Sequence, residues 1–138
     1  MIAYLDASAL VKYLIEEPGT DRAERLWQTA SDRYTSRITY AEARAALARA
    51  GRDGRTTPRE QATARRGLDM RWDALRQIGV TDGLVRLAGD LADRRALRGY
   101  DAVHLASALI LGGEVVMATW DRELSDAASE EGLPTLTI

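Results

Sequence analysis

Apolar residues along the chain form two kinds of pattern, short continuous runs and longer stretches with helical spacing. The runs over residues 1–5 and 114–119 predict buried strands. Residues 7–17 carry apolar side chains three and four positions apart, which is typical of a helix with one buried face. Short strands are also predicted at 33–36 and 133–138. Further helices are predicted from Thr20 or Asp21 to about residue 30, over 39–50, 57–77, 81–97 and 121–131, and from Asp101 onwards.

This order of elements predicts the fold class. Short apolar strands that alternate with helices are typical of a parallel sheet that is covered on both faces. The 138 residues fit one domain, the clearest loop is at residues 51–55, and no linker or internal repeat interrupts the chain. We therefore expect a single domain over residues 1–138, an α/β fold built as a three-layer α/β/α sandwich with a short, mainly parallel central sheet.

Composition excludes several classes of site. The chain has no cysteine, which excludes a disulfide scaffold, a cysteine nucleophile and a thiolate metal site. His104 is the single histidine, so a histidine-rich metal site is excluded too. No apolar stretch approaches the ~20 residues of a membrane span, and the first residues lack a basic leader. We expect a cytoplasmic protein with no membrane partner.

The net charge is −2, yet 18 of the 19 basic residues are arginine. Biased codon usage explains such a preference, and so does selection for phosphate recognition, which suits the planar guanidinium group.

Four acidic residues stand at the beginnings or ends of predicted elements. Asp6 ends the first strand, and Asp121 follows the strand over residues 114–119. Asp101 begins a helix that is apolar almost all round, and Glu42 lies in the first turn of another helix. Because the carboxyl ends of parallel strands meet at one edge of a sheet, these four acids are candidates to converge on one pocket.

Each acid also has a purely structural interpretation. Glu42 follows Thr39 by three positions, the spacing of a capping box. Asp101 and Asp121 fit as first-turn acids favoured by the helix dipole. Asp6 could cap the helix that follows it, although its place at the end of an apolar strand is harder to explain by capping alone.

The combination of four acids is what indicates chemistry. Carboxylates held close together repel one another, so such a cluster binds protons or a cation. Oxygen donors without cysteine favour hard cations, Mg²⁺ or Mn²⁺. Ions held in this way activate a water and clamp a phosphodiester. The sequence therefore predicts metal-dependent phosphodiester hydrolysis without a covalent nucleophile.

Four strings in this order resemble a known family. They are YLDASAL at residues 4–10, YAE at 40–42, YDAVHLASA at 100–108 and ATWDREL at 118–124. They resemble the PIN domain and, more narrowly, the VapC toxins of bacterial toxin–antitoxin pairs, over essentially the whole chain. The resemblance places the family's four catalytic, metal-binding acids at Asp6, Glu42, Asp101 and Asp121. It makes Asp6 and Asp101 the central ligands and places Ser8 and Thr119 on polar positions that line the same pocket.

The resemblance also implies an activity and partners. It predicts an Mg²⁺- or Mn²⁺-dependent endoribonuclease that hydrolyses structured RNA, such as tRNA or rRNA, with a metal-activated water. It further implies a homodimer and a cognate antitoxin of the VapB type. Surplus apolar residues in the two early helices, Val11, Leu14, Ile15 and Trp27 among them, would suit either of these interfaces.

Three further residues have two interpretations each. His104 is either a structural histidine with satisfied hydrogen bonds or a substrate contact, because it lies three positions after Asp101. Trp120 is either part of the core or a platform for a base. Arg44 is either a solvated surface residue or a phosphate contact beside the acids.

Two other classes of function are alternatives to this interpretation. A non-catalytic PIN-like scaffold that binds RNA or a protein is the main alternative. A phospho-accepting receiver domain also uses an acidic strand end, but it needs paired acids after the first strand and a late lysine. Asp6 stands alone here, and the single lysine is Lys12.

Overall fold

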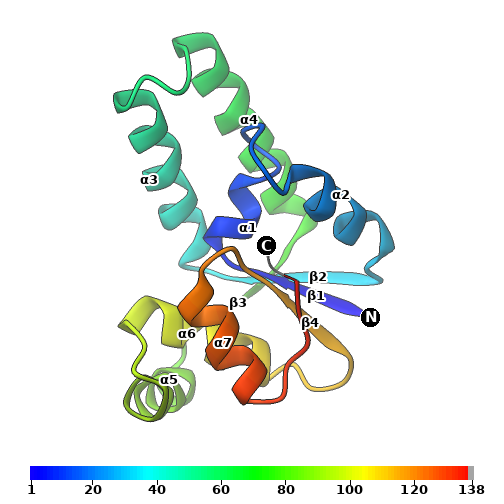
Figure 1. Ribbon diagram of the computed structural model, residues 1–138, viewed down its shortest axis with the longest axis vertical. Helices are drawn as coiled ribbons and strands as arrows, with labels where there is room; N and C mark the ends of the chain where they lie inside the picture. Colours follow the sequence, from blue (N-terminus) through cyan, green and yellow to red (C-terminus); the bar gives the residue numbers. More distant parts are fainter. Residues whose placement is uncertain (137–138) are drawn as a thin grey trace.

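The apolar strands lie side by side in one sheet at the centre of the molecule (Figure 1). The computed structural model describes residues 1–136. All the strand pairs are parallel, and the strand order is β3-β2-β1-β4-β5. The central strand β1 pairs with β2 on one side and with β4 on the other, so that Ile2 lies between Asp32 and Val115. The strands are β1 (Ile2–Leu5), β2 (Asp32–Ser36), β3 (Arg76–Ile78), β4 (Val115–Ala118) and β5 (Thr135–Leu136).

Helices cover both faces of this sheet and produce two hydrophobic cores. Alternate residues of β1 point in opposite directions, as the two-residue period of a strand requires. Tyr4 packs in the core formed with α5, α6 and α7, whereas Ala3 and Leu5 pack in the core formed with α1 to α4. The helices are α1 (Ala7–Val11), α2 (Thr20–Thr29), α3 (Thr39–Arg52), α4 (Pro58–Ala74), α5 (Asp82–Arg95), α6 (Gly99–Leu109) and α7 (Arg122–Glu130). Within residues 1–136, no helix is both long and apolar enough to cross a membrane.

The predicted α/β/α sandwich is confirmed, but one strand was missed. The helix expected over residues 57–77 ends at Ala74, and β3 follows it. Leu75 is extended, with φ −97° and ψ 139°, yet its buried side chain continues the helical spacing of Leu68 and Trp72. That spacing concealed the end of the helix, and the sequence Arg76-Gln77-Ile78 has no apolar run to indicate a strand.

The helix expected over residues 7–17 was also wrong in extent. It ends at Val11, because Lys12, Tyr13 and Leu14 donate to carbonyls three residues back rather than four. This tighter turn keeps the apolar side chains at similar spacing.

Smaller boundary errors occur at four other elements. α2 is capped by Gly19 instead of Thr20 or Asp21, and α3 continues to Arg52, into the predicted loop over 51–55. α6 begins two residues before Asp101, at Gly99. The predicted strand over 133–138 is confirmed only at Thr135–Leu136, and residues 137 and 138 lie outside the described residues.

Candidate active site

Asp6 lies at the carboxyl end of β1 and is both a helix cap and a buried acid. Its Oδ1 atom accepts hydrogen bonds from the Ala9 backbone N–H at 2.9 Å and from the Ser8 hydroxyl at 2.7 Å. Its Oδ2 atom accepts from the Thr119 hydroxyl at 2.6 Å. Burial raises the pKa of the Asp6 carboxyl above its usual value, although these hydrogen bonds favour the ionised form. The capping interpretation of Asp6 is therefore correct. The same carboxylate also contacts Ser8 and Thr119, so Asp6 stays a candidate site residue.

Ser8 and Thr119 join the end of β1 to the start of α7. The Ser8 oxygen accepts a hydrogen bond from the Trp120 backbone N–H at 2.8 Å, and the Thr119 oxygen accepts from the Asp121 N–H at 3.0 Å. Each hydroxyl donates to Asp6 and accepts from the segment after β4. The two polar residues thus fix the position of Asp6 relative to Asp121.

Asp101 and Asp121 share a single arginine. Arg98 Nε donates to Asp101 Oδ2 at 3.1 Å, and Arg98 Nη2 donates to Asp121 Oδ2 at 3.2 Å. Asp121 is also the N-cap of α7, where its Oδ1 accepts from the Leu124 N–H at 2.9 Å. Burial and the nearby Asp121 charge raise the pKa of Asp101, and they outweigh the contact with Arg98. Two carboxylates therefore lie close enough to repel each other, with one cation between them.

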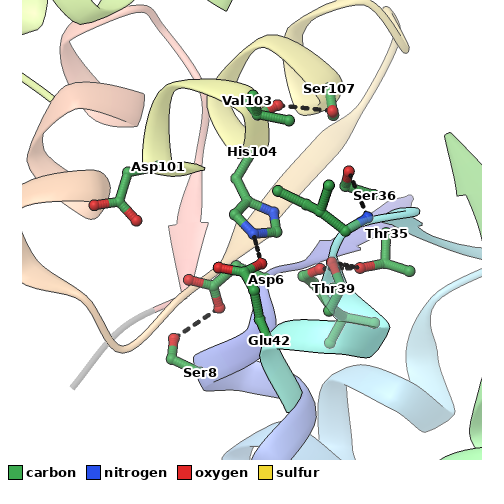
Figure 2. A network of polar contacts seen from close by, with 12 residues as sticks. Asp6, Ser8, Thr35, Ser36, Thr39, Glu42, Asp101, Val103, His104 and Ser107 are labelled. Carbon is green, nitrogen blue, oxygen red and sulfur yellow. Dashed lines mark hydrogen bonds and ion pairs between the residues drawn. The ribbon is translucent and has the colours of Figure 1, made fainter. Parts of the chain in front are cut away.

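The fourth acid, Glu42, is held by a buried histidine. His104 Nε2 lies 2.6 Å from Glu42 Oε1, and His104 Nδ1 lies 2.8 Å from the Tyr4 hydroxyl. Figure 2 shows the imidazole reaching from α6 towards Glu42, with Ser8 hydrogen-bonded to Asp6 nearby and Asp101 to one side. The chain Tyr4–His104–Glu42 ties β1, α6 and α3 together.

This contact overturns the capping-box interpretation of Glu42. The N-cap of α3 is Ile38, with no side-chain hydrogen bond, and the Thr39 hydroxyl accepts from the Thr35 hydroxyl instead. The Glu42 side chain is therefore directed to a residue of another helix.

The electrostatics around His104 favour its charged form. Burial opposes protonation, but the hydrogen bond to Glu42 and the charges of Asp6, Glu42 and Asp101 outweigh it, so the pKa of His104 is raised. The histidine is almost completely buried, which supports its structural interpretation rather than direct contact with a substrate.

A groove of about 630 Å³ lies beside the acids. Of the four candidate acids, Glu42 lines this groove, and Ser8, Arg49, Arg55 and Arg98 line it as well. Acidic and basic groups therefore meet in one depression, which suits a substrate that carries phosphates next to a cation. Its apolar lining comes from Ala7, Val11, Ile15, Ala46 and Trp120.

Trp120 and Arg44 occupy different surroundings. The Trp120 ring lines the groove, where the Lys12 ammonium lies 5.3 Å from the ring centre. Arg44 is not brought to the acids. It contacts the Tyr40 hydroxyl at 3.2 Å and lines a separate hollow with Gln61 and Arg65.

The sequence reasoning missed two residues of this site. Arg98 had a usable signal, because it precedes Asp101 by three positions and Asp101 lies in the first turn of a helix. Tyr4 had only the alternation of its strand, which gives no indication of a partner 100 residues away.

The donor set fits a hard divalent cation. The four acids supply only oxygen ligands, and Arg98 shows that the pair Asp101 and Asp121 accepts a positive group between them. Across residues 1–136, no three acidic or histidine side chains are gathered closely enough to form a ready-made metal cluster. Asp101 and Asp121 therefore form a pair of oxygen donors that already holds one positive group, the Arg98 guanidinium.

Comparison with known proteins identifies the family to which this chain belongs. The family model of the PIN domain matches residues 3–130. The chain belongs to the PIN domain family.

Its relatives narrow the resemblance. It is 45% identical over 132 residues to "Ribonuclease VapC45" of Mycobacterium tuberculosis, covering 95% of this chain and 92% of the relative. The fold is similar to that of M. tuberculosis VapC20, described as a sarcin-ricin loop cleaving toxin, with a TM-score of 0.70, 21% identity and 95% of each chain covered. It is also similar to a chain of a toxin-antitoxin complex from Klebsiella pneumoniae, with a TM-score of 0.67, 17% identity, and 98% of this chain and 96% of that chain covered. The resemblance to VapC toxins is thus confirmed.

Proposed function

We propose that this chain is a divalent-cation-dependent endoribonuclease that acts in the cytoplasm as the toxin of a toxin–antitoxin pair. The observation that carries the proposal is the pair Asp101 and Asp121, which already holds a positive group at the carboxyl edge of the sheet. The ribonuclease name of its 45% identical relative supports RNA as the substrate. The sarcin-ricin loop named for VapC20 supports a structured RNA of the translation machinery.

The proposed chemistry assigns a task to each acidic residue. A bound Mg²⁺ or Mn²⁺ would supply an activated water and would offset the charge of the scissile phosphate. Asp101 and Asp121 would hold the ion, with Asp6 beside them. Ser8 and Thr119 keep the Asp6 carboxylate in one orientation, which limits the reorganisation needed during the reaction.

Glu42 has a supporting task in this proposal. One of its oxygens is bound by His104, so its position on the groove wall is fixed from the interior. Arg49 and Arg55 would contact phosphates of the RNA, because they line the same groove as Glu42.

We also propose an antitoxin partner of the VapB type and a homodimer. The similarity to a chain of a toxin-antitoxin complex supports the first. Val11 and Ile15 are only partly buried and line the groove, so they offer apolar surface next to the acids. An antitoxin segment seated there would block access to the site.

The alternative is a PIN-like scaffold that binds RNA or protein without cleaving it. The absence of a ready-made three-ligand cluster within residues 1–136 is the observation that favours it. Calorimetry separates the two: an enzyme binds Mn²⁺ and loses this binding in the double variant Asp6→Asn, Asp101→Asn, whereas a scaffold shows no such binding.

The direct test is RNA cleavage by the purified protein freed of antitoxin. Total bacterial RNA is incubated with the protein and Mg²⁺ or Mn²⁺, and the new 5′ ends are sequenced. The proposal predicts discrete cuts that disappear with EDTA and with Asp101→Asn. Asp126→Asn is the matched control, because Asp126 is an exposed aspartate of α7, and it should retain the cuts. Cuts that persist with Asp101→Asn would contradict the proposal.

A further inference from the structure

Arg98 occupies the place that a cation would take between Asp101 and Asp121. It stands immediately before α6, and its guanidinium donates to the Oδ2 atoms of both acids, at 3.1 and 3.2 Å. Asp101 lies in the first turn of α6 and Asp121 is the N-cap of α7, and this arginine is the group that bridges them.

The hydrogen bonds of Asp121 leave only one of its two carboxylate oxygens available to a metal ion. Its Oδ1 atom caps α7 through the Leu124 N–H, so Oδ2 is the atom that can turn to a metal ion without uncapping the helix. That atom is the one bound by Arg98. A divalent ion placed beside the guanidinium would meet like charge, so binding at this pair requires Arg98 to leave.

Arg98 can leave at small cost. Its side chain is 74% exposed, whereas those of Asp101 and Asp121 are 14% and 29% exposed. The guanidinium therefore moves into solvent easily, and the incoming cation takes over the neutralisation of the two carboxylates. It also lines the groove with Arg49 and Arg55, so the displaced guanidinium stays next to the path proposed for the RNA.

We propose that Arg98 occupies the cation position until a divalent ion displaces it. It neutralises the acid pair in the cation-free protein and, after displacement, binds a phosphate of the RNA in the groove. This inference rests on the proposed function. It makes Arg98 a positioning residue with two opposite effects, because it weakens cation binding and strengthens substrate binding.

The test is Mn²⁺ binding measured by calorimetry on the full chain. Arg98→Ala should bind Mn²⁺ about three- to tenfold more tightly than the wild type, the range expected when a surface ion-pair bridge no longer competes. Arg122→Ala is the matched control. It removes the same charge from an exposed residue next to Asp121, one with no hydrogen bond or ion pair in the described part of the chain. It should change affinity by less than about twofold.

A second readout follows the displaced side chain itself. In ¹H–¹⁵N spectra, Mg²⁺ should shift the Nε–H signal of Arg98 as the bond to Asp101 breaks. In cleavage assays at saturating Mn²⁺, Arg98→Ala should raise KM for RNA more than it lowers kcat.

The outcomes separate this inference from the proposed function. If the wild type binds Mn²⁺ and Arg98→Ala binds it no more tightly than Arg122→Ala, Arg98 does not compete with the cation. The inference is then wrong, and the ribonuclease proposal stands. If no variant binds Mn²⁺, both are wrong. Binding by Arg98→Ala alone would show that Mn²⁺ does not displace Arg98 from the wild type, and it would contradict the inference.

Discussion

Replacing Tyr4 with phenylalanine removes one hydroxyl group and keeps the ring in place. Tyr4 is completely buried, and its hydroxyl lies 2.8 Å from His104 Nδ1. The variant therefore leaves a buried ring nitrogen without its partner, which costs about 1–3 kcal/mol. An unfolding entropy of ~2.1 cal/mol/K per residue gives about 0.29 kcal/mol/K for 138 residues. The predicted fall in Tm is thus ~3–10 °C.

Thermal unfolding followed by circular dichroism measures this effect. Tyr100→Phe is the matched control, because Tyr100 is 67% exposed and its loss of a hydroxyl should change stability by less than ~0.5 kcal/mol. A fall in Tm below ~1 °C for Tyr4→Phe, or an equal fall in both variants, would refute the view that the Tyr4–His104–Glu42 chain stabilises the site.

Three further predictions concern the same edge of the sheet. Gly19→Ala should lower the unfolding free energy measured by chemical denaturation by ~2–4 kcal/mol. Gly19 has φ +99°, and an added Cβ would lie 2.6 Å from the Trp120 indole nitrogen. A loss below ~1 kcal/mol would be too small for such a clash. Thr119→Val should destabilise the protein by ~1–3 kcal/mol by removing a donor to buried Asp6, and unchanged stability would contradict this hydrogen bond. The pKa of His104 is raised from 6.5, so its stabilising contribution is complete below pH ~6.5 and is lost as pH rises through the raised pKa. The difference in unfolding free energy between the wild type and His104→Gln should therefore narrow as pH rises above ~6.5, and a constant difference would show that the charge of His104 is unimportant.

The sequence predicted the elements that carry strong hydrophobic patterns. β1 and β4 were found because continuous apolar runs are typical of strands buried on both faces. β3 was missed because it is three residues long and begins with exposed Arg76, directly after a helix with continuing apolar spacing. Short edge strands are defined by the neighbour they pair with, here β2, and this information is not local.

The candidate site was predictable in its acids and less so in the groups that hold them. Asp6 and Asp121 are placed by the ends of parallel strands, which follow from the order of elements. The pairing of Glu42 with His104 joins residues 62 positions apart, and it competes with a local capping box that the sequence also allowed. Such choices depend on distances between elements, which a sequence pattern does not contain.

The central claim is that the carboxylate site hydrolyses RNA with water as the nucleophile. The most direct test is the chemistry of the product ends, measured by mass spectrometry on an RNA fragment cut by the wild-type protein in the presence of Mg²⁺ or Mn²⁺. The account predicts a 5′-phosphate and a 3′-hydroxyl, with no product from Asp101→Asn. A 2′,3′-cyclic phosphate would contradict it, because that product requires the ribose 2′-hydroxyl as the nucleophile.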